Sequence, residues 1–130
     1  MNRAPLTASM LGAVAVGGAA GALLRWGLGV ALPDGSGFPW TTFAINLSGT
    51  FLLALLSALD ATRRRPLLAL ALGPGVLGGY TTLSAYAEQA RALFADGSVA
   101  LAGGYLLGTL AACVAAVHLA TCLARPERHP

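Results

Sequence analysis

Charge is what this sequence has least of. Its 130 residues include eight basic and five acidic residues, and every basic residue is an arginine. These charges cluster between four uncharged runs, residues 4–24, 35–59, 66–87 and 97–124. A soluble helical bundle would carry polar residues at helical spacing along its outer faces, and the four runs have almost none. Since each run is longer than the roughly 20 residues that cross a ~30 Å hydrocarbon core, the sequence predicts a protein of the lipid membrane.

Residues for catalysis and metal binding are also scarce. The sequence contains no Ser-His-Asp set, no Walker phosphate loop and no H-E-x-x-H motif, which argues against an enzyme. His118 is predicted to lack the ligating partners that a metal centre requires. The arginine triplet at 63–65 is typical of a short loop without interleaved aromatic residues, so nucleic acid is not an expected partner. No acid–base couple is expected among the charged residues that border the spans, Arg25, Asp60, Glu88 and Arg91.

The uncharged runs predict an all-α integral membrane fold with a single domain over residues 1–130. Four transmembrane helices are expected at about 6–32, 38–60, 66–94 and 97–123. The connections at 33–37 and 96–98 are short and rich in turn residues, so neighbouring helices should run antiparallel.

The arginines are distributed unequally across this predicted topology. Arg25 and Arg91 fall on one side, and six fall on the other: Arg3, Arg63, Arg64, Arg65, Arg125 and Arg128. By the positive-inside rule, both termini and the connection at 63–65 face the cytoplasm, as expected for a multi-pass protein of the plasma membrane.

The third run is interrupted by polar residues at a depth where hydrocarbon is expected. Residues 78–86 read GGYTTLSAY, a glycine pair followed by hydroxyl-bearing side chains. Irregular backbone inside a bilayer persists only where it is buried in protein or lines a wet cavity. Broken helices supply carbonyls and amides to ion sites, so this segment predicts a broken third helix and the handling of an ion.

Other polar residues within the spans need partners. Asn46 is the only carboxamide of the second span, with Thr42 and Thr50 one turn to either side; it binds either a neighbouring helix or a hydrated ligand. Arg25 snorkels to the interface, supplies positive charge near an anion route, or binds carbonyls freed by the broken helix. The fourth span carries a polar stripe, Tyr105, Thr109 and Cys113. From the sequence, this stripe either packs against a neighbouring helix or lines an ion pathway.

Small residues recur at four-residue spacing along two spans. Such stripes let helix backbones approach closely in lipid, and the sequence leaves open whether they pack within the chain or form a dimer seam. Because four short helices enclose little volume, we expect a second subunit to complete any pore. The stripes are Ala13, Gly17 and Gly21, then Gly104, Gly108, Ala112 and Ala116.

Three segments carry motifs that occur together in one family. Residues 17–26 read GGAAGALLRW, and residues 41–51 read TTFAINLSGTF. They resemble the G-x-x-G-A-x-x-R-[YW] opening and the T-x-x-x-N-x-x-G-[ST]-F second helix of the Fluc (CrcB) fluoride channels. Residues 75–86, GVLGGYTTLSAY, resemble the G-x-x-G-G-[FY]-T-T-F-S-T-F break of the same family. Motifs, order and spacing agree, so the resemblance covers residues 8 to about 122.

The resemblance implies a fluoride-selective channel subunit that exports fluoride passively. It implies a dimer of antiparallel, dual-topology subunits with two fluoride pathways along the interface. A structural Na⁺ that is not transported would be held at the dimer centre by the main-chain carbonyls of Gly78 and Thr81, since hard cations prefer oxygen ligands. Amide and hydroxyl donors and the weakly positive edges of aromatic rings would replace the water around fluoride. The pathway positions that the resemblance implies are Arg25, Asn46, Leu83, Ser84, Tyr86, Tyr105 and Thr109.

Two of these positions depart from the family pattern. The phenylalanines of the family are replaced by Leu83 and Tyr86; Tyr86 retains a ring, whereas Leu83 has no ring edge to present to an anion. Together with the six-to-two distribution of arginines, this favours the hypothesis that the chain inserts in one orientation and pairs with an oppositely oriented homologue. A homodimer is the other arrangement that the resemblance allows.

Two other functions compete with a conducting channel subunit. One is a structural partner subunit that completes a heterodimeric fluoride channel and conducts weakly or not at all. The other is a small multidrug-type exporter, and the absence of a carboxylate from the first span counts against it.

Overall fold

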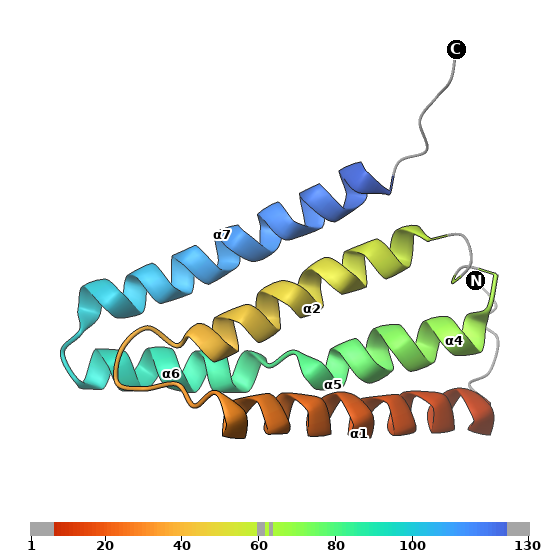
Figure 1. Ribbon diagram of the computed structural model, residues 1–130, viewed down its shortest axis with the longest axis horizontal. Coiled ribbons are helices and arrows are strands. Elements are labelled where there is room, and N and C mark those ends of the chain that lie inside the picture. The colour runs from red at the N-terminus through yellow and green to blue at the C-terminus, as the bar shows by residue number, and fades with distance from the viewer. Residues whose placement is uncertain (1–6, 60–61, 63, 125–130) are drawn as a thin grey trace, which may run out of the picture.

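The computed structural model describes residues 7–59, 62 and 64–124, and in these residues it contains helices and connections but no strand (Figure 1). The third span, Pro66–Ala95, consists of four successive pieces, whereas each of the other spans is one helix. The elements are α1 (Ala8–Ala31), α2 (Trp40–Ala58), α4 (Pro66–Leu70), η1 (Ala71–Leu77), α5 (Gly78–Tyr80), α6 (Leu83–Ala95) and α7 (Val99–Leu123).

All four spans are long and apolar enough to cross a membrane. The prediction of four transmembrane helices with a broken third helix is therefore confirmed. Large apolar side chains lie exposed on their surfaces; Trp26 is 67%, Leu107 71% and Leu83 78% exposed. Such surfaces require lipid or another chain to cover them, and the chain is a multi-pass membrane protein.

The connections lie at two ends of the molecule. Those between α1 and α2 and between α6 and α7 share one end, and the connection from α2 to α4, which contains Arg64 and Arg65, lies at the other (Figure 1). Four of the arginines that carry the orientation prediction lie outside the described residues, so that orientation stays a prediction: Arg3, Arg63, Arg125 and Arg128.

The η1 segment is a widened, π-type helix built around Pro74. Proline has no amide hydrogen, and in a regular helix its ring would meet the carbonyl four residues earlier. A π-bulge spreads the turn and relieves both problems. Gly73 and Gly75 flank the proline and are buried, so this stretch lies close to its neighbours.

The helix breaks at Thr81 and Thr82, after the glycine pair and not within it. Gly78 has helical angles, φ −66° and ψ −37°, whereas Thr81 and Thr82 are extended, with ψ of 158° and 114°. The glycine pair is therefore still helical, and the irregular backbone lies in the hydroxyl-bearing part of the run. Gly79 instead permits close packing, because a Cβ on it would overlap the main chain of Gly18.

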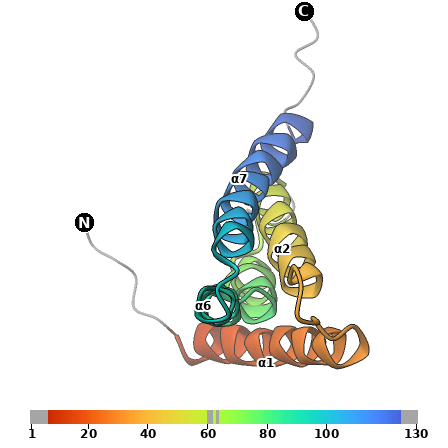
Figure 2. The same ribbon diagram turned by 90° about the vertical axis from the view of Figure 1, so that its left-hand side faces the viewer.

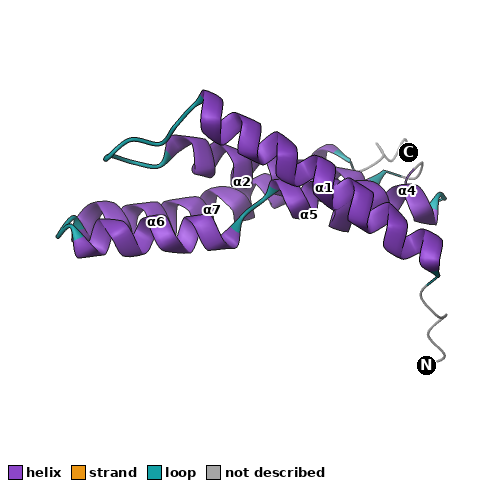
Figure 3. Cartoon of the chain, turned by 90° about the horizontal axis from the view of Figure 1, so that it is seen from below, coloured by secondary structure: helices purple, strands orange, loops and turns teal. Residues whose placement is uncertain are grey.

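Helix α1 crosses one side of the molecule and packs mainly against η1 and α5, as the end view and the view from below show (Figures 2 and 3). A Cβ on Gly17 would lie 3.1 Å from the Cα of Gly75, and a Cβ on Gly21 would lie 2.8 Å from the amide nitrogen of Tyr80. The first small-residue stripe therefore serves packing within the chain.

Helix α7 packs on α2 and, to a lesser extent, on α6. Its stripe divides in two: Ala116 is buried, whereas a Cβ on Gly104 or Gly108 would meet no atom within 4 Å. These two glycines are exposed, and nothing in the described chain uses the close approach that they permit.

Candidate functional site

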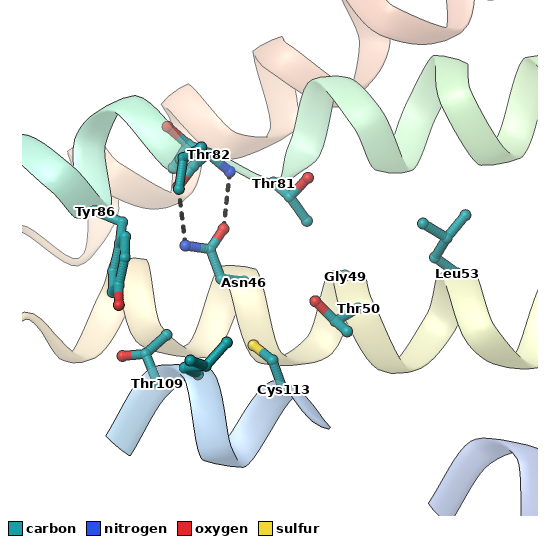
Figure 4. Close-up of a pocket in the computed structure, with 11 residues that line it drawn as sticks. Asn46, Gly49, Thr50, Leu53, Thr81, Thr82, Tyr86, Thr109 and Cys113 are labelled. Atoms are coloured by element: carbon teal, nitrogen blue, oxygen red, sulfur yellow. Dashed lines mark hydrogen bonds between the residues drawn. The ribbon is translucent and has the colours of Figure 1, made fainter. Parts of the chain in front are cut away.

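Four of the predicted pathway residues line one pocket between α2, α6 and α7, with a volume of about 290 Å³ (Figure 4). They are Asn46, Leu83, Tyr86 and Thr109. The helices that carry them are distant in sequence, and the fold brings their polar groups to one place among apolar walls. The remaining lining residues are Gly49, Thr50, Leu53, Thr81, Thr82, Leu110 and Cys113.

Asn46 holds the helix break. Its Nδ2 donates to the Thr82 carbonyl at 3.0 Å, and the Thr82 amide donates to its Oδ1 at 2.8 Å (Figure 4). An extended residue in lipid has lost its helical partners, and each buried unpaired group would cost about 1–3 kcal/mol. Asn46 satisfies both main-chain groups of Thr82. The structure therefore shows Asn46 as a link between two helices, which is one of the two interpretations that its sequence position left open. The second hydrogen of its amide has no acceptor among the described residues.

Thr109 brings an unpartnered hydroxyl to the pocket. Thr109 is 4% exposed, and its Oγ1 forms no hydrogen bond with the described residues. Buried hydroxyls nearly always have a partner, so an unpaired one beside a pocket indicates room for a ligand or water. Thr109 and Cys113 lie on the side of α7 that faces Asn46 (Figure 4).

The two positions that replace phenylalanine differ in their surroundings. Leu83 is 78% exposed at the rim of the pocket. The Tyr86 hydroxyl donates to the Leu106 carbonyl at 2.7 Å, so its hydroxyl is bound to the backbone of α7. Ser84 is exposed and its Oγ lies 3.2 Å from the Thr82 Oγ1; it does not line the pocket.

Arg25 binds the main chain of the third span. Its Nε donates to the Gly79 carbonyl at 3.2 Å, which is the third of the interpretations that its sequence position left open. The guanidinium lies outside the first pocket and borders a second cavity of about 370 Å³ between α1, α2 and α6. Thr82 lines both cavities, so the helix break lies between them.

A polar network joins the α1–α2 connection to three helices. The Oδ1 of Asp34 accepts the Thr41 amide at 2.7 Å, and its Oδ2 accepts the Thr42 amide at 3.2 Å and the Thr42 hydroxyl at 3.0 Å. Gln89 Nε2 donates to the same Oδ2 at 3.1 Å. The Oε1 of Gln89 in turn accepts the hydroxyl of Tyr105 at 2.9 Å. Tyr105 is fully buried, so its hydroxyl proton is held inside the network.

Sequence reasoning missed Asp34 and Gln89. Asp34 reads as a turn residue, and the available signal was an acidic residue shortly before a helix N-terminus, where it can cap free amides. Burial acts to raise the pKa of Asp34, but hydrogen bonds from Thr41, Thr42 and Gln89 outweigh it and hold that pKa below its ordinary value. The carboxylate is therefore charged at neutral pH.

The break also leaves main-chain oxygens with altered partners. A continuous helix would direct the Thr82 amide to the Gly78 carbonyl, but this amide donates to Asn46 instead. Gly78 is exposed, the Gly79 carbonyl accepts from Arg25, and Thr81 is extended. Main-chain oxygens such as those of Gly78 and Thr81 are the ligand type that a hard cation such as Na⁺ prefers.

Two side-chain pairs differ from the sequence predictions. The Sγ of Cys122 lies 3.6 Å from the Nε2 of His118, so the prediction that His118 lacks a ligating neighbour is wrong. Two such groups are fewer than a structural metal centre uses, and the described residues contain no cluster of three. Glu88 and Arg91, expected to form no acid–base couple, form an exposed ion pair at 2.7 Å. Asp60 lies outside the described residues.

Comparisons with known proteins cover almost the whole chain. A family model described as "CrcB-like protein, Camphor Resistance (CrcB)" matches residues 12–121. The chain is 41% identical to the "Fluoride-specific ion channel FluC 2" of Nocardia farcinica, over 93% of this chain and 89% of the relative. It is 40% identical to the "Fluoride-specific ion channel FluC 1" of Streptomyces coelicolor, over 91% and 79% of the two chains. It is also 40% identical to the "Fluoride-specific ion channel FluC" of Agrobacterium fabrum, over 86% and 93%.

Proposed function

The chain belongs to the CrcB-like family, and from this premise we propose that it is a subunit of a fluoride-selective channel. Fluoride leaves the cytoplasm through it passively, which lowers fluoride toxicity. Relatives named as fluoride-specific ion channels match it over nearly its full length. An ion channel is not an enzyme, which agrees with the scarcity of catalytic motifs.

The observation that carries the proposal is the unpartnered hydroxyl of Thr109, which shares a pocket with the free amide hydrogen of Asn46. Fluoride is small and strongly hydrated, so a pathway must replace its water with N–H and O–H donors. The edge of the Tyr86 ring adds a weakly positive surface to the same pocket. A narrow passage lined in this way disfavours larger anions by size.

The role proposed for the main-chain oxygens is structural. The carbonyls of Gly78 and Thr81 would bind a resident Na⁺ that is not transported, since such oxygens suit a hard cation. Two oxygens are fewer than such a cation takes, so the same pair from a second subunit would complete the site. When bound, the cation would tie the two broken helices together.

The proposed assembly is an antiparallel dimer in the plasma membrane, with both termini of this chain in the cytoplasm. The exposed glycines of α7 and the exposed Leu83 leave surface for a second subunit. Because six arginines are predicted on one side and two on the other, we propose a partner that is an oppositely oriented homologue. A homodimer is the alternative, and a partner subunit that conducts weakly itself is the second candidate function, favoured by Leu83.

Fluoride efflux from liposomes, followed with a fluoride electrode, tests the function. Liposomes that contain this chain with an oppositely oriented homologue should release fluoride at least about tenfold faster than protein-free liposomes, and chloride should be retained. Efflux from liposomes with this chain alone should be weak. Absence of efflux from both assemblies would refute the channel function, and fast efflux by the chain alone would refute the requirement for a homologue.

The substitution Leu83→Phe separates a compromised pathway from a structural subunit. A phenylalanine would restore a ring edge at the rim of the pocket, so efflux by this chain alone should rise about fivefold, within the ~0.5–1.5 kcal/mol that one aromatic contact contributes. Leu107→Phe is the matched control, because Leu107 is similarly exposed but lies on α7 outside the pocket. An equal effect of both substitutions would favour the structural role.

A further inference from the structure

We propose that Asp34 is a positioning carboxylate that draws the hydrogen-bond donors of the second cavity toward itself and thereby restrains the entry of fluoride. This inference rests on the proposed channel function. It concerns the network at the end of the molecule that holds the α1–α2 and α6–α7 connections, and not the pocket beside Asn46.

Four donors converge on the Asp34 carboxylate. They are the amides of Thr41 and Thr42, the hydroxyl of Thr42 and the Nε2 of Gln89, at 2.7–3.2 Å. N–H and O–H groups that converge in this way are what a small, hard anion needs in place of water. Asp34 is an anion supplied by the chain itself, so these donors are already occupied.

The carboxylate also sets the direction of the hydrogen bonds behind it. A carboxylate only accepts, so Gln89 turns its Nε2 toward Asp34, where it also donates to the Thr42 hydroxyl at 2.9 Å. Its Oε1 then faces Tyr105. The Tyr105 hydroxyl then donates to Gln89 at 2.9 Å. The proton of a predicted pathway residue is thus held by Gln89, because of a charge two side chains away.

Asp34 lies where an anion would enter the second cavity, so its charge and its hydrogen bonds can affect the entry of that anion. Asp34, Gln89 and Thr42 border the second cavity, and Thr82 borders both this cavity and the pocket that contains Asn46. The other charged side chain of the cavity is Arg25, whose Nε is bound to the Gly79 carbonyl. An anion that passes from the second cavity toward the pocket would pass the negative charge of Asp34.

The substitution Asp34→Asn changes the donors with little change of shape. Three donors face Oδ2 and one faces Oδ1, so the oxygen of the new carboxamide should take the place of Oδ2 and its NH₂ should face the Thr41 amide. Two facing N–H groups repel each other, and a neutral oxygen holds the Thr42 and Gln89 donors more weakly than a carboxylate does. The Thr41 amide, the Gln89 Nε2 and one amide hydrogen of residue 34 then become available to an anion.

The test is the initial rate of fluoride efflux from liposomes, in whichever assembly the wild-type protein conducts, at fluoride concentrations below saturation. Asp34→Asn should raise this rate about threefold or more, which is modest for a charge removed from a cleft. Asp96→Asn is the matched control: it removes the same charge at the same end, from an exposed turn outside the network. Its effect should stay below about 1.5-fold, because exposed charges are screened by salt.

A double-mutant cycle distinguishes positioning from a general effect on structure. If Asp34 acts through Gln89, the effect of Asp34→Asn should be at least about twofold smaller in a Gln89→Leu background, because only the effects of the removed charge and of the other donors then remain. Gel filtration checks that each variant assembles, and Asp34→Ser, which should shift the rate in the same direction, replaces the asparagine variant if that one does not assemble. An equal or lower rate for Asp34→Asn than for Asp96→Asn, or an unchanged effect in the Gln89→Leu background, would overturn the inference alone. Absence of wild-type efflux from both assemblies would overturn the channel function as well.

Discussion

The chain contains two glycine stripes that look alike in sequence and are used differently. On α1, Gly17 and Gly21 lie against the main chain of η1 and α5, where a Cβ would overlap backbone atoms. On α7, Gly104 and Gly108 are exposed and have no atom within 4 Å of the place a Cβ would occupy. Small residues therefore mark where a backbone can approach, whereas the packing of the chain decides whether one does.

The difference between the two stripes determines how the two parts of the broken helix are supported. Contact with α1 supports the part before the break, because Gly79 and Gly21 allow α1 and α5 to touch and Arg25 binds the Gly79 carbonyl. The part after the break is supported by polar contacts, from Asn46 to Thr82 and from Gln89 to the Asp34 network. Of the two stripes, only the one on α7 leaves its glycines open to a second subunit.

The largest expected effect comes from closing the α1 stripe. Gly21→Ala should lower the free energy of unfolding by about 3 kcal/mol, because backbone atoms of Val76 and Tyr80 cannot move aside as a side chain can. Gly12→Ala is the control on the same helix, where a Cβ meets no atom within 4 Å. It should be neutral or stabilising by up to about 1 kcal/mol, since alanine favours helix. Unfolding in mixed detergent micelles measures both, and similar values for the two variants would contradict the difference between the sites.

The next effect comes from filling the open stripe. Gly108→Leu should leave the helix content unchanged, since nothing in the chain occupies that space, but should weaken dimerisation at least about tenfold if α7 lies in the seam. Gly12→Leu on α1 is the control, and it should not alter the dimer. Energy transfer between labelled subunits in detergent gives the dissociation constant. Unchanged dimerisation of the Gly108→Leu variant would show that the open stripe faces lipid.

The smallest effect concerns the polar support of the other half of the broken helix. Because hydrogen bonds hold the pKa of Asp34 below its ordinary 3.8 in the folded protein, folding favours the carboxylate form. This stabilisation is complete above about pH 5 and is lost as the pH falls below 4 toward the lowered pKa. The free energies of unfolding of the wild type and Asp34→Asn should therefore differ by a constant amount from about pH 8 to 5 and converge in acid. A difference that widens as the pH falls would contradict the assigned direction.

Several features of the site could be read from the sequence. The polar run at 78–86 predicted the break because hydroxyl residues and glycines are costly in hydrocarbon, and Asn46 predicted a partner for the same reason. That the break lies at Thr81 and Thr82 could not be read, since it depends on Asn46 reaching both main-chain groups of Thr82. Gln89 and Asp34 were missed because their contact joins residues 55 positions apart, and neither forms a local motif.

The sequence by itself determined the membrane environment, the four spans, the broken third helix and the family. These properties follow from composition, local spacing and motifs, because hydrocarbon selects the same residue types wherever they lie in the chain. Only the tertiary structure decided which glycine stripe is closed, which atoms end the helix and which donors face Asp34. Those outcomes depend on distances between residues on different helices, and no local pattern contains such distances.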